Sequence, residues 1–80
     1  MPQSVHSPRY LKLLGILADA RKTAGISQVV LAERLDCIQT YVSKYERGER
    51  RLDIIEFLDV ARALNLDPCK VIRQLEKSSG

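Results

Sequence analysis

Eighty residues suffice for one domain with a small core, and the share of hydrophobic (45%) and charged (29%) residues is that of a globular chain. No apolar run approaches the roughly 20 residues of a membrane-spanning helix, so we expect a cytoplasmic protein. Cys37, Cys69 and His6 fall short of the about four ligands of a structural metal site. We therefore predict no metal or cofactor, and two reduced thiols at partly buried positions.

The charge is distributed unevenly along the chain. Residues 1–52 carry nine Lys or Arg and five Asp or Glu, whereas residues 53–80 carry four and five, which gives net charges of +4 and −1. A domain with one anion-facing side shows such an asymmetry. The difference is small enough to arise by chance, so it does not decide the function.

Residues 8–76 are expected to form the folded domain, with a disordered leader at 1–7 and a disordered tail at 77–80. From Pro8, apolar residues recur at helical spacing and predict the buried stripe of a first helix. They are Tyr10, Leu13, Leu14, Leu17, Ala20 and Ala24. Gly25 ends this helix, because the residue after a helix often adopts the left-handed conformation that glycine tolerates.

Two short helices are predicted next. Ser27 is a suitable N-cap for the second helix, whose apolar positions are Val30, Leu31 and Leu35. After a break at residues 36–37, a third helix covers about residues 38–47. Its inward residues are Val42 and Tyr45, and Gly48 ends it.

The last two helices carry clear start signals. Asp53 and Glu56 form a capping box for the fourth helix. Its predicted core face consists of Ile54, Phe57, Leu58, Ala61 and Leu64, and Asn65 is a plausible left-handed terminator. Asp67 and Pro68 begin a fifth helix, with Val71, Ile72 and Leu75 inward. No segment alternates with period two for long enough to be a strand, so we predict an all-α fold of five helices.

The gap between the second and third predicted helices is only about three residues, which forces a sharp crossing of the helix-turn-helix kind. Ala32 is small enough to let the two helices approach closely, and Val42 is placed to fill the space between them. The corner residue is Asp36, which accepts a positive φ less easily than glycine but better than most residues.

The segment SQVVLAERLDCIQTYVSKYERGERRLD, residues 27–53, resembles the lambda-repressor-like, Cro-type (XRE) helix-turn-helix family of DNA-binding transcriptional regulators. The resemblance extends over about residues 10–75. The matching features are Arg21, Gly25, Ser27-Gln28, Leu31-Ala32, Leu35, Val42-Ser43, Tyr45-Glu46-x-Gly48 and Ala61-x-Ala63-Leu64-x-Leu66. The family usually has glycine where Asp36 stands, and often Ser, Thr or Pro where Ile38 stands.

The resemblance implies that the third helix lies in the major groove and presents its N-terminal, outward side chains to base edges. Glutamine suits adenine edges, lysine suits guanine acceptors, and a threonine methyl can contact thymine. The implied base-reading residues are Gln39, Thr40, Ser43 and Lys44. The implied phosphate-binding residues are Ser27, Gln28, Tyr41, Arg47, Arg50 and Arg51. Arg21 and Glu46 occupy positions that commonly form an ion pair in the family, so they receive a structural role.

We therefore predict a sequence-specific regulator of transcription that binds double-stranded DNA as a homodimer, since one small helix reads only a few base pairs. We take it to be a repressor, although the residues do not distinguish repression from activation. The final two helices are the expected dimer interface, unless the fifth helix merely covers the core.

The alternative is a protein-interaction module with the same fold, such as an antitoxin or an accessory subunit of a larger complex. An enzyme is disfavoured because the sequence has no nucleophile–base pair and no phosphate loop. No small-molecule ligand is evident.

Overall fold

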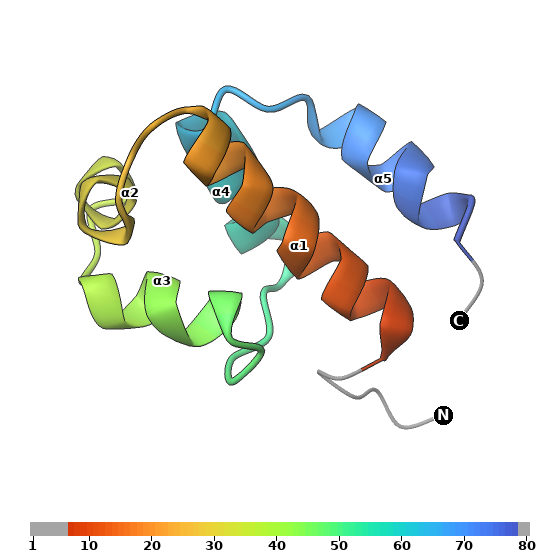
Figure 1. Ribbon diagram of the computed structural model, residues 1–80, viewed down its shortest axis with the longest axis horizontal. Coiled ribbons are helices and arrows are strands. Elements are labelled where there is room, and N and C mark those ends of the chain that lie inside the picture. Colours follow the sequence, from red (N-terminus) through yellow and green to blue (C-terminus); the bar gives the residue numbers. More distant parts are fainter. Residues whose placement is uncertain (1–6, 79–80) are drawn as a thin grey trace.

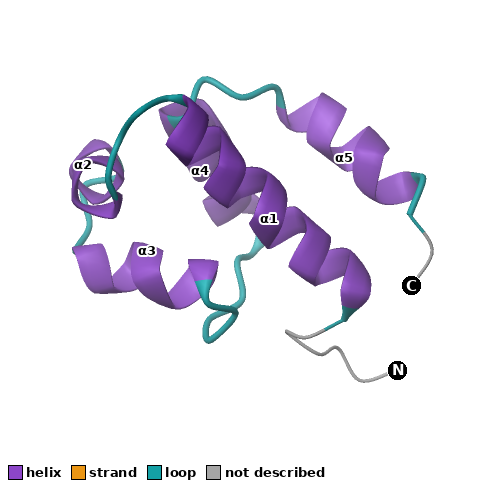
Figure 2. Cartoon of the chain, viewed as in Figure 1, coloured by secondary structure: helices purple, strands orange, loops and turns teal. Residues whose placement is uncertain are grey.

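The computed structural model describes residues 7–78, which form five helices and no strand (Figure 1, Figure 2). The helices are α1 (Pro8–Thr23), α2 (Gln28–Arg34), α3 (Gln39–Glu46), α4 (Ile54–Ala63) and α5 (Pro68–Glu76). α2 packs against α3, and α1 contacts both α3 and α5. Figure 1 shows α2 and α3 on one side of α1 and α5 on the other. The prediction of an all-α fold with five helices is confirmed.

Residues 1–6, including His6, and residues 79–80 lie outside the described residues, and with them most of the predicted leader and part of the predicted tail. The described ends contact the helices. Ser7 is the N-cap of α1, and its hydroxyl accepts a hydrogen bond from the backbone N–H of Tyr10 at 3.2 Å. Ser78 follows α5, and its hydroxyl accepts a hydrogen bond from the Lys12 ammonium at 2.7 Å.

Each of the four connections between helices contains one residue with positive φ. They are Gly25 (75°), Asp36 (55°), Gly48 (77°) and Asn65 (55°). Asp and Asn tolerate the left-handed region better than most residues because a short polar side chain can form local hydrogen bonds there. Asp36 supplies the sharp corner between α2 and α3 that the helix-turn-helix crossing requires. These four chain reversals are the ones predicted from the sequence.

All five helices contribute side chains to the core. Its largest fully buried side chains are Tyr45, Leu17, Leu31, Val42, Val60 and Val71. Tyr10 and Phe57, which we predicted to be core residues, are 7% and 5% exposed. Within residues 7–78, none of the helices is both long and apolar enough to cross a membrane.

Several residues predicted to face the core are instead exposed. Ile54 (59%), Leu58 (36%) and Ile72 (40%) are accessible to solvent, and so is Ala24, because it lies at the C-terminal cap of α1. The buried stripe of α4 consists of Phe57, Val60, Ala61 and Leu64, at the i, i+3, i+4, i+7 spacing of one helix face. Ile54 and Leu58 lie beside that stripe, and Val60 was missed.

The two cysteines also differ from expectation in part. Both thiols are free, and Cys37 is half-buried as predicted, but Cys69 is exposed in the first turn of α5. Burial and the nearby Asp36 carboxylate raise the pKa of the Cys37 thiol. A thiol held in its neutral form is a poor nucleophile.

Two core tyrosines have opposite hydroxyl environments. The Tyr10 hydroxyl accepts a hydrogen bond from the Leu52 backbone N–H at 3.0 Å and donates one to the Arg50 carbonyl at 3.4 Å. The Tyr45 hydroxyl is buried and has no hydrogen-bond partner among residues 7–78. A buried hydroxyl without a partner loses its hydration without compensation.

This difference predicts opposite effects of removing each hydroxyl. Tyr45→Phe should raise the free energy of unfolding by about 1 kcal/mol, because it removes an uncompensated polar atom. Tyr10→Phe should lower it by about 1–2 kcal/mol, because the Leu52 N–H would lose its acceptor. Urea unfolding of both variants measures the two changes. A destabilised Tyr45→Phe variant would contradict the absence of a partner for that hydroxyl.

Candidate nucleic-acid interface

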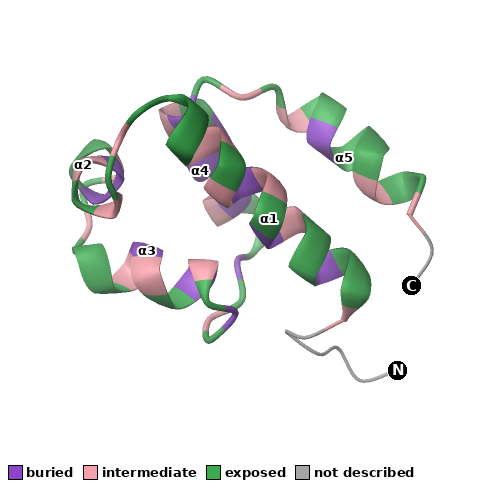
Figure 3. Cartoon of the chain, in the orientation of Figure 1, coloured by how far each residue is buried: buried purple, intermediate pink, exposed green. Residues whose placement is uncertain are grey.

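The outer face of α3 is defined by what the helix buries. Val42 and Tyr45 are fully buried against the core, as predicted. Thr40 and Lys44 lie on the opposite side of the helix, and Gln39 lies in its first turn, three residues before Val42. All three are exposed, and Figure 3 shows the beginning of α3 open to solvent. Three of the four predicted base-reading residues are therefore accessible.

The fourth, Ser43, is half-buried and already bonded. Its hydroxyl accepts a hydrogen bond from the Arg47 guanidinium one turn later. α3 begins at Gln39, one residue later than predicted, with Ile38 as its N-cap. No side chain accepts a hydrogen bond at this cap, because isoleucine has no acceptor atom.

A largely buried ion pair joins the last residue of α3 to α1. The Arg21 guanidinium contacts the Glu46 carboxylate through two hydrogen bonds of 2.7 and 3.2 Å, with side-chain exposures of only 12% and 8%. A third guanidinium hydrogen bond goes to the Ile26 carbonyl at 2.9 Å. The hydrogen bond that Arg21 donates to Glu46 raises the pKa of Arg21 above its already high ordinary value. Arg21 therefore remains charged at neutral pH.

From Glu46 a chain of hydrogen bonds continues to the surface. The Gln28 amide nitrogen donates to Glu46 Oε1 at 2.9 Å, and the Gln39 amide nitrogen donates to Gln28 Oε1 at 2.8 Å. A carboxylate only accepts hydrogen bonds, so Gln28 must turn its nitrogen toward Glu46. The Gln28 side-chain oxygen then faces Gln39, so Gln39 must donate a hydrogen bond through its amide nitrogen. Glu46 thus sets the orientation of both amides.

The beginning of α2 lies at the middle of this chain. Ser27 is the N-cap of α2, and its hydroxyl accepts a hydrogen bond from the Val30 backbone N–H at 3.1 Å. The side chain of Gln28, which we predicted to bind phosphate, is half-buried and engaged with both Glu46 and Gln39. The first turn of α2 thereby positions α3.

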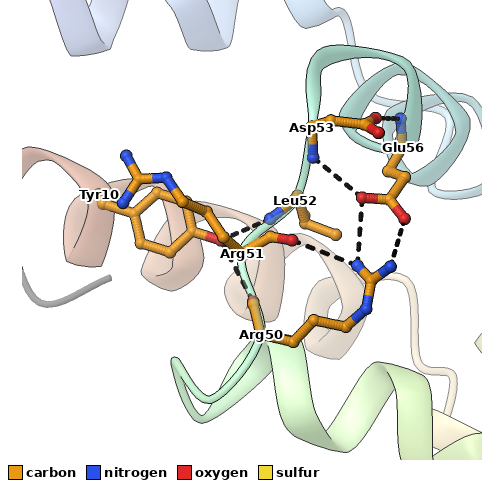
Figure 4. A network of polar contacts seen from close by, with 6 residues as sticks. All are labelled: Tyr10, Arg50, Arg51, Leu52, Asp53 and Glu56. Carbon is orange, nitrogen blue, oxygen red and sulfur yellow. Dashed lines mark hydrogen bonds and ion pairs between the residues drawn. The ribbon is translucent and has the colours of Figure 1, made fainter. Parts of the chain in front are cut away.

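The loop after α3 is anchored to α4 through Arg50. Its guanidinium forms two hydrogen bonds to the Glu56 carboxylate, at 3.1 and 2.6 Å (Figure 4). It also lies 4.6 Å from the centre of the Tyr41 ring. Glu56 Oε1 also accepts the Asp53 backbone N–H at 2.9 Å and completes the predicted capping box. Arg50 holds the pKa of Glu56 below its ordinary value.

The same loop is anchored to α1 through Tyr10. The Tyr10 hydroxyl bonds the backbone on both sides of Arg51, and the Arg51 guanidinium lies 4.4 Å from the centre of the Tyr10 ring (Figure 4). Arg51 itself remains an exposed residue. Neither anchor was predicted from the sequence, which had identified Tyr10 only as core and Glu56 only as a cap.

The predicted phosphate-binding arginines are therefore not equivalent. Arg47 pairs with Glu49 through hydrogen bonds of 2.8 and 3.1 Å, and both side chains are more than half exposed. Arg50 is less exposed, at 40%, and its two hydrogen bonds to Glu56 hold the loop. Burial, and then the nearby Glu56 carboxylate, raises the pKa of Tyr41 to about 12. Tyr41 is therefore a neutral hydrogen-bond donor at physiological pH.

Within residues 7–78, no group of three or more His, Cys, Asp or Glu side chains is arranged to hold a metal ion. The surface offers instead amide, hydroxyl and cationic groups at the beginning of one helix, with a half-buried tyrosine beside them. Such groups recognise base edges and phosphates.

Comparison with known proteins gives the same picture. The family model described as Helix-turn-helix matches residues 17–71. The chain is 49% identical to the XRE-family like protein from Pseudomonas syringae pv. tomato strain DC3000, with a TM-score of 0.85 over 90% of this chain and 88% of that one. It is 31% identical to the restriction-modification controller protein C.AhdI from Aeromonas hydrophila, with a TM-score of 0.70 over 76% and 88%. None of the curated proteins matches the sequence significantly.

The fold and the exposed face of α3 define the class: a DNA-binding transcriptional regulator of the helix-turn-helix type. Within that class, the chain belongs to the XRE-type helix-turn-helix family, as the resemblance over residues 10–75 predicted. This family and fold are those of DNA-binding regulators rather than of enzymes.

The Arg21–Glu46 pair predicts a large stability effect of one substitution. Glu46→Ala should lower the free energy of unfolding by about 3 kcal/mol, because it leaves Arg21 buried without its counter-charge. Glu49→Ala, which breaks the exposed pair with Arg47, should change the stability far less. Denaturant unfolding of both variants tests this contrast, and equal effects would contradict it.

Proposed function

We propose that the protein is a repressor that binds a specific double-stranded DNA site as a homodimer, with α3 in the major groove. The observation that carries this proposal is the chain of hydrogen bonds from Arg21 through Glu46 and Gln28 to Gln39. It fixes an exposed amide at the beginning of α3 in one orientation. Groups held in advance lose less entropy when they bind.

The fixed orientation suits an adenine edge. Adenine presents the N7 acceptor and the N6 donor in the major groove. Gln39 gives one N–H to Gln28, and its second N–H and its carbonyl oxygen remain to bind N7 and N6 together. Lys44 is exposed on the same face and can donate to guanine O6 or N7, and the Thr40 methyl can contact a thymine.

Phosphate contacts then come from the flanks of this face. Arg47 lies on the exposed surface, and an exposed ion pair such as Arg47–Glu49 contributes little, so a phosphate can replace the carboxylate. Arg51 and Tyr41 are the further phosphate-binding residues on the side of the loop. Ser27 and Gln28 are those at the beginning of α2. Arg50 acts mainly by holding the loop, and its positive charge also attracts the phosphates.

The proposed dimer interface lies on α4 and α5. An apolar groove of about 200 Å³ is lined by Leu13, Ile54, Phe57, Ile72 and Leu75. Ile54 and Ile72 are 59% and 40% exposed, and they continue the apolar surface onto Ile55 and Leu58 of α4. Exposed apolar surface gathered on two neighbouring helices favours a contact with another protein chain.

A second copy of this chain fits this apolar surface. Two-fold symmetry brings the same patch of two copies together, so each side must offer groups that complement itself. The groove is lined by apolar side chains from α1, α4 and α5, and an apolar patch meets this condition because it is complementary to a copy of itself.

Selection of DNA from a random duplex pool at about physiological salt, where non-specific binding is weak, tests the proposed function. We expect enrichment of a two-fold symmetric sequence with half-site centres about 34 Å, or one helical turn, apart. Gln39→Ala/Lys44→Ala should keep the helicity but lose about 1–3 kcal/mol of discrimination at the bases read by each residue. Thr23→Ala, at the end of α1, is the matched control.

Two outcomes would contradict this proposal. If no sequence is enriched and DNA binds only at low salt, the protein-interaction module becomes the better interpretation. If the double variant selects the same sites as the unaltered protein, the assignment of base-reading residues is wrong.

Ile72→Glu tests the dimer. A carboxylate buried in an apolar interface should weaken self-association by about 100-fold or more, whereas Leu11→Glu on α1 should leave it unchanged, because Leu11 lies outside the groove. Sedimentation equilibrium measures both association constants, and circular dichroism checks that both variants fold. An unaltered protein that remains monomeric at millimolar concentration would contradict the homodimer.

A further inference from the structure

Ile38 is an exposed aliphatic residue at a position that favours a polar one. Its side chain is 70% exposed, more than any other large hydrophobic residue in the described part of the chain. It is the N-cap of α3, where Ser, Thr, Asp or Asn would accept a hydrogen bond from the first turn. Ile38 makes no such bond. Isoleucine therefore contributes neither burial nor capping to the fold.

The position of Ile38 places it beside the proposed base-reading groups. Its backbone is extended (φ −96°, ψ 156°), and its carbonyl accepts the Tyr41 N–H at 3.1 Å in the first turn of α3. The next residue is Gln39, whose amide is held by Gln28. Ile38 therefore lies at the end of α3 that meets base edges in the proposed complex.

An isolated aliphatic side chain here is too small a surface for a protein partner. Between residues 35 and 53, Ile38 is the only exposed large hydrophobic residue among those described, while four of the others lie together on α4 and α5. Protein-binding surfaces gather several such residues around a buried centre. A single apolar side chain in the major groove can contact one group of matching size, the methyl group of thymine, which is the only one of the four bases that presents a methyl group there.

We infer that Ile38 is a further specificity-determining residue, which contacts the C5-methyl group of a thymine next to the base read by Gln39. This inference rests on the proposed function, because it requires α3 to enter the major groove. It explains why a residue that weakens the helix start stands at this position. The contact discriminates thymine from cytosine and also from uracil, which pairs like thymine but lacks the methyl group.

The test uses the duplex selected from the random pool. Each thymine of the half-site is replaced in turn by deoxyuridine, and the dissociation constant is measured by fluorescence anisotropy. At the thymine next to the base read by Gln39, the unaltered protein should lose about fourfold in affinity per half-site, the effect of one buried methyl group, and about 15-fold when both half-sites are changed. Ile38→Ala should bind the two duplexes equally.

Two control variants separate this role from a structural one. Ile38→Ser supplies a capping hydroxyl and should be at least as stable as the unaltered protein, yet it should also be indifferent to the methyl group. Leu11→Ala removes an exposed aliphatic side chain of α1 and should keep the full preference for thymine.

The outcomes distinguish the two proposals. Failure of the pool to yield any sequence would overturn the proposed function, and this inference with it. A selected site in which no thymine-to-deoxyuridine change matters, or in which Ile38→Ala retains the loss, would overturn the role of Ile38 and leave the proposed function intact.

Discussion

The carboxylate of Glu46 is the group on which the arrangement of α1, α2 and α3 depends. It lies at the end of α3 and accepts hydrogen bonds from Arg21 of α1 and Gln28 of α2. A buried charge is tolerated only when it is paired and hydrogen-bonded, and here three donors from two other helices meet that requirement. The carboxylate keeps its hydrogen bonds only if α1, α2 and α3 keep their relative positions. This requirement constrains their geometry more strongly than apolar contact alone.

A second set of long-range contacts fixes the loop between α3 and α4. Tyr10 bonds this loop from α1, and Glu56 binds Arg50 from α4. The loop is therefore anchored to both α1 and α4, and these contacts fix the positions of Arg50 and Arg51. The aromatic rings of Tyr10 and Tyr41 lie under Arg51 and Arg50, where stacking keeps the guanidinium planes in place without removing their charge.

The sequence predicted the fold well because its signals are local. Gly25, Asp36, Gly48 and Asn65 mark chain reversals within a few residues of each helix end, and all four have positive φ. On α4 the signal was ambiguous. Apolar residues occupy positions 54, 55, 57, 58, 60 and 61 and cover most of the circumference, so their periodicity does not define one buried stripe.

The site was predictable in outline only. The accessible face of α3 follows from burial of Val42 and Tyr45, but the partners of its side chains do not follow from spacing. Tyr10 and Leu52 are 42 residues apart, and Arg50 meets Glu56 only because the loop turns back onto α4. No periodic pattern encodes such contacts.

Under the proposed function, the ion pairs of the loop influence DNA binding, since Glu49 and Glu56 offset part of the charge of Arg47 and Arg50. Non-specific affinity comes from phosphate neutralisation, so internal carboxylates reduce it more than they reduce base contacts. Discrimination then depends on the beginning of α3, where the hydrogen bonds from Gln39 through Gln28 to Glu46 hold the Gln39 amide in place.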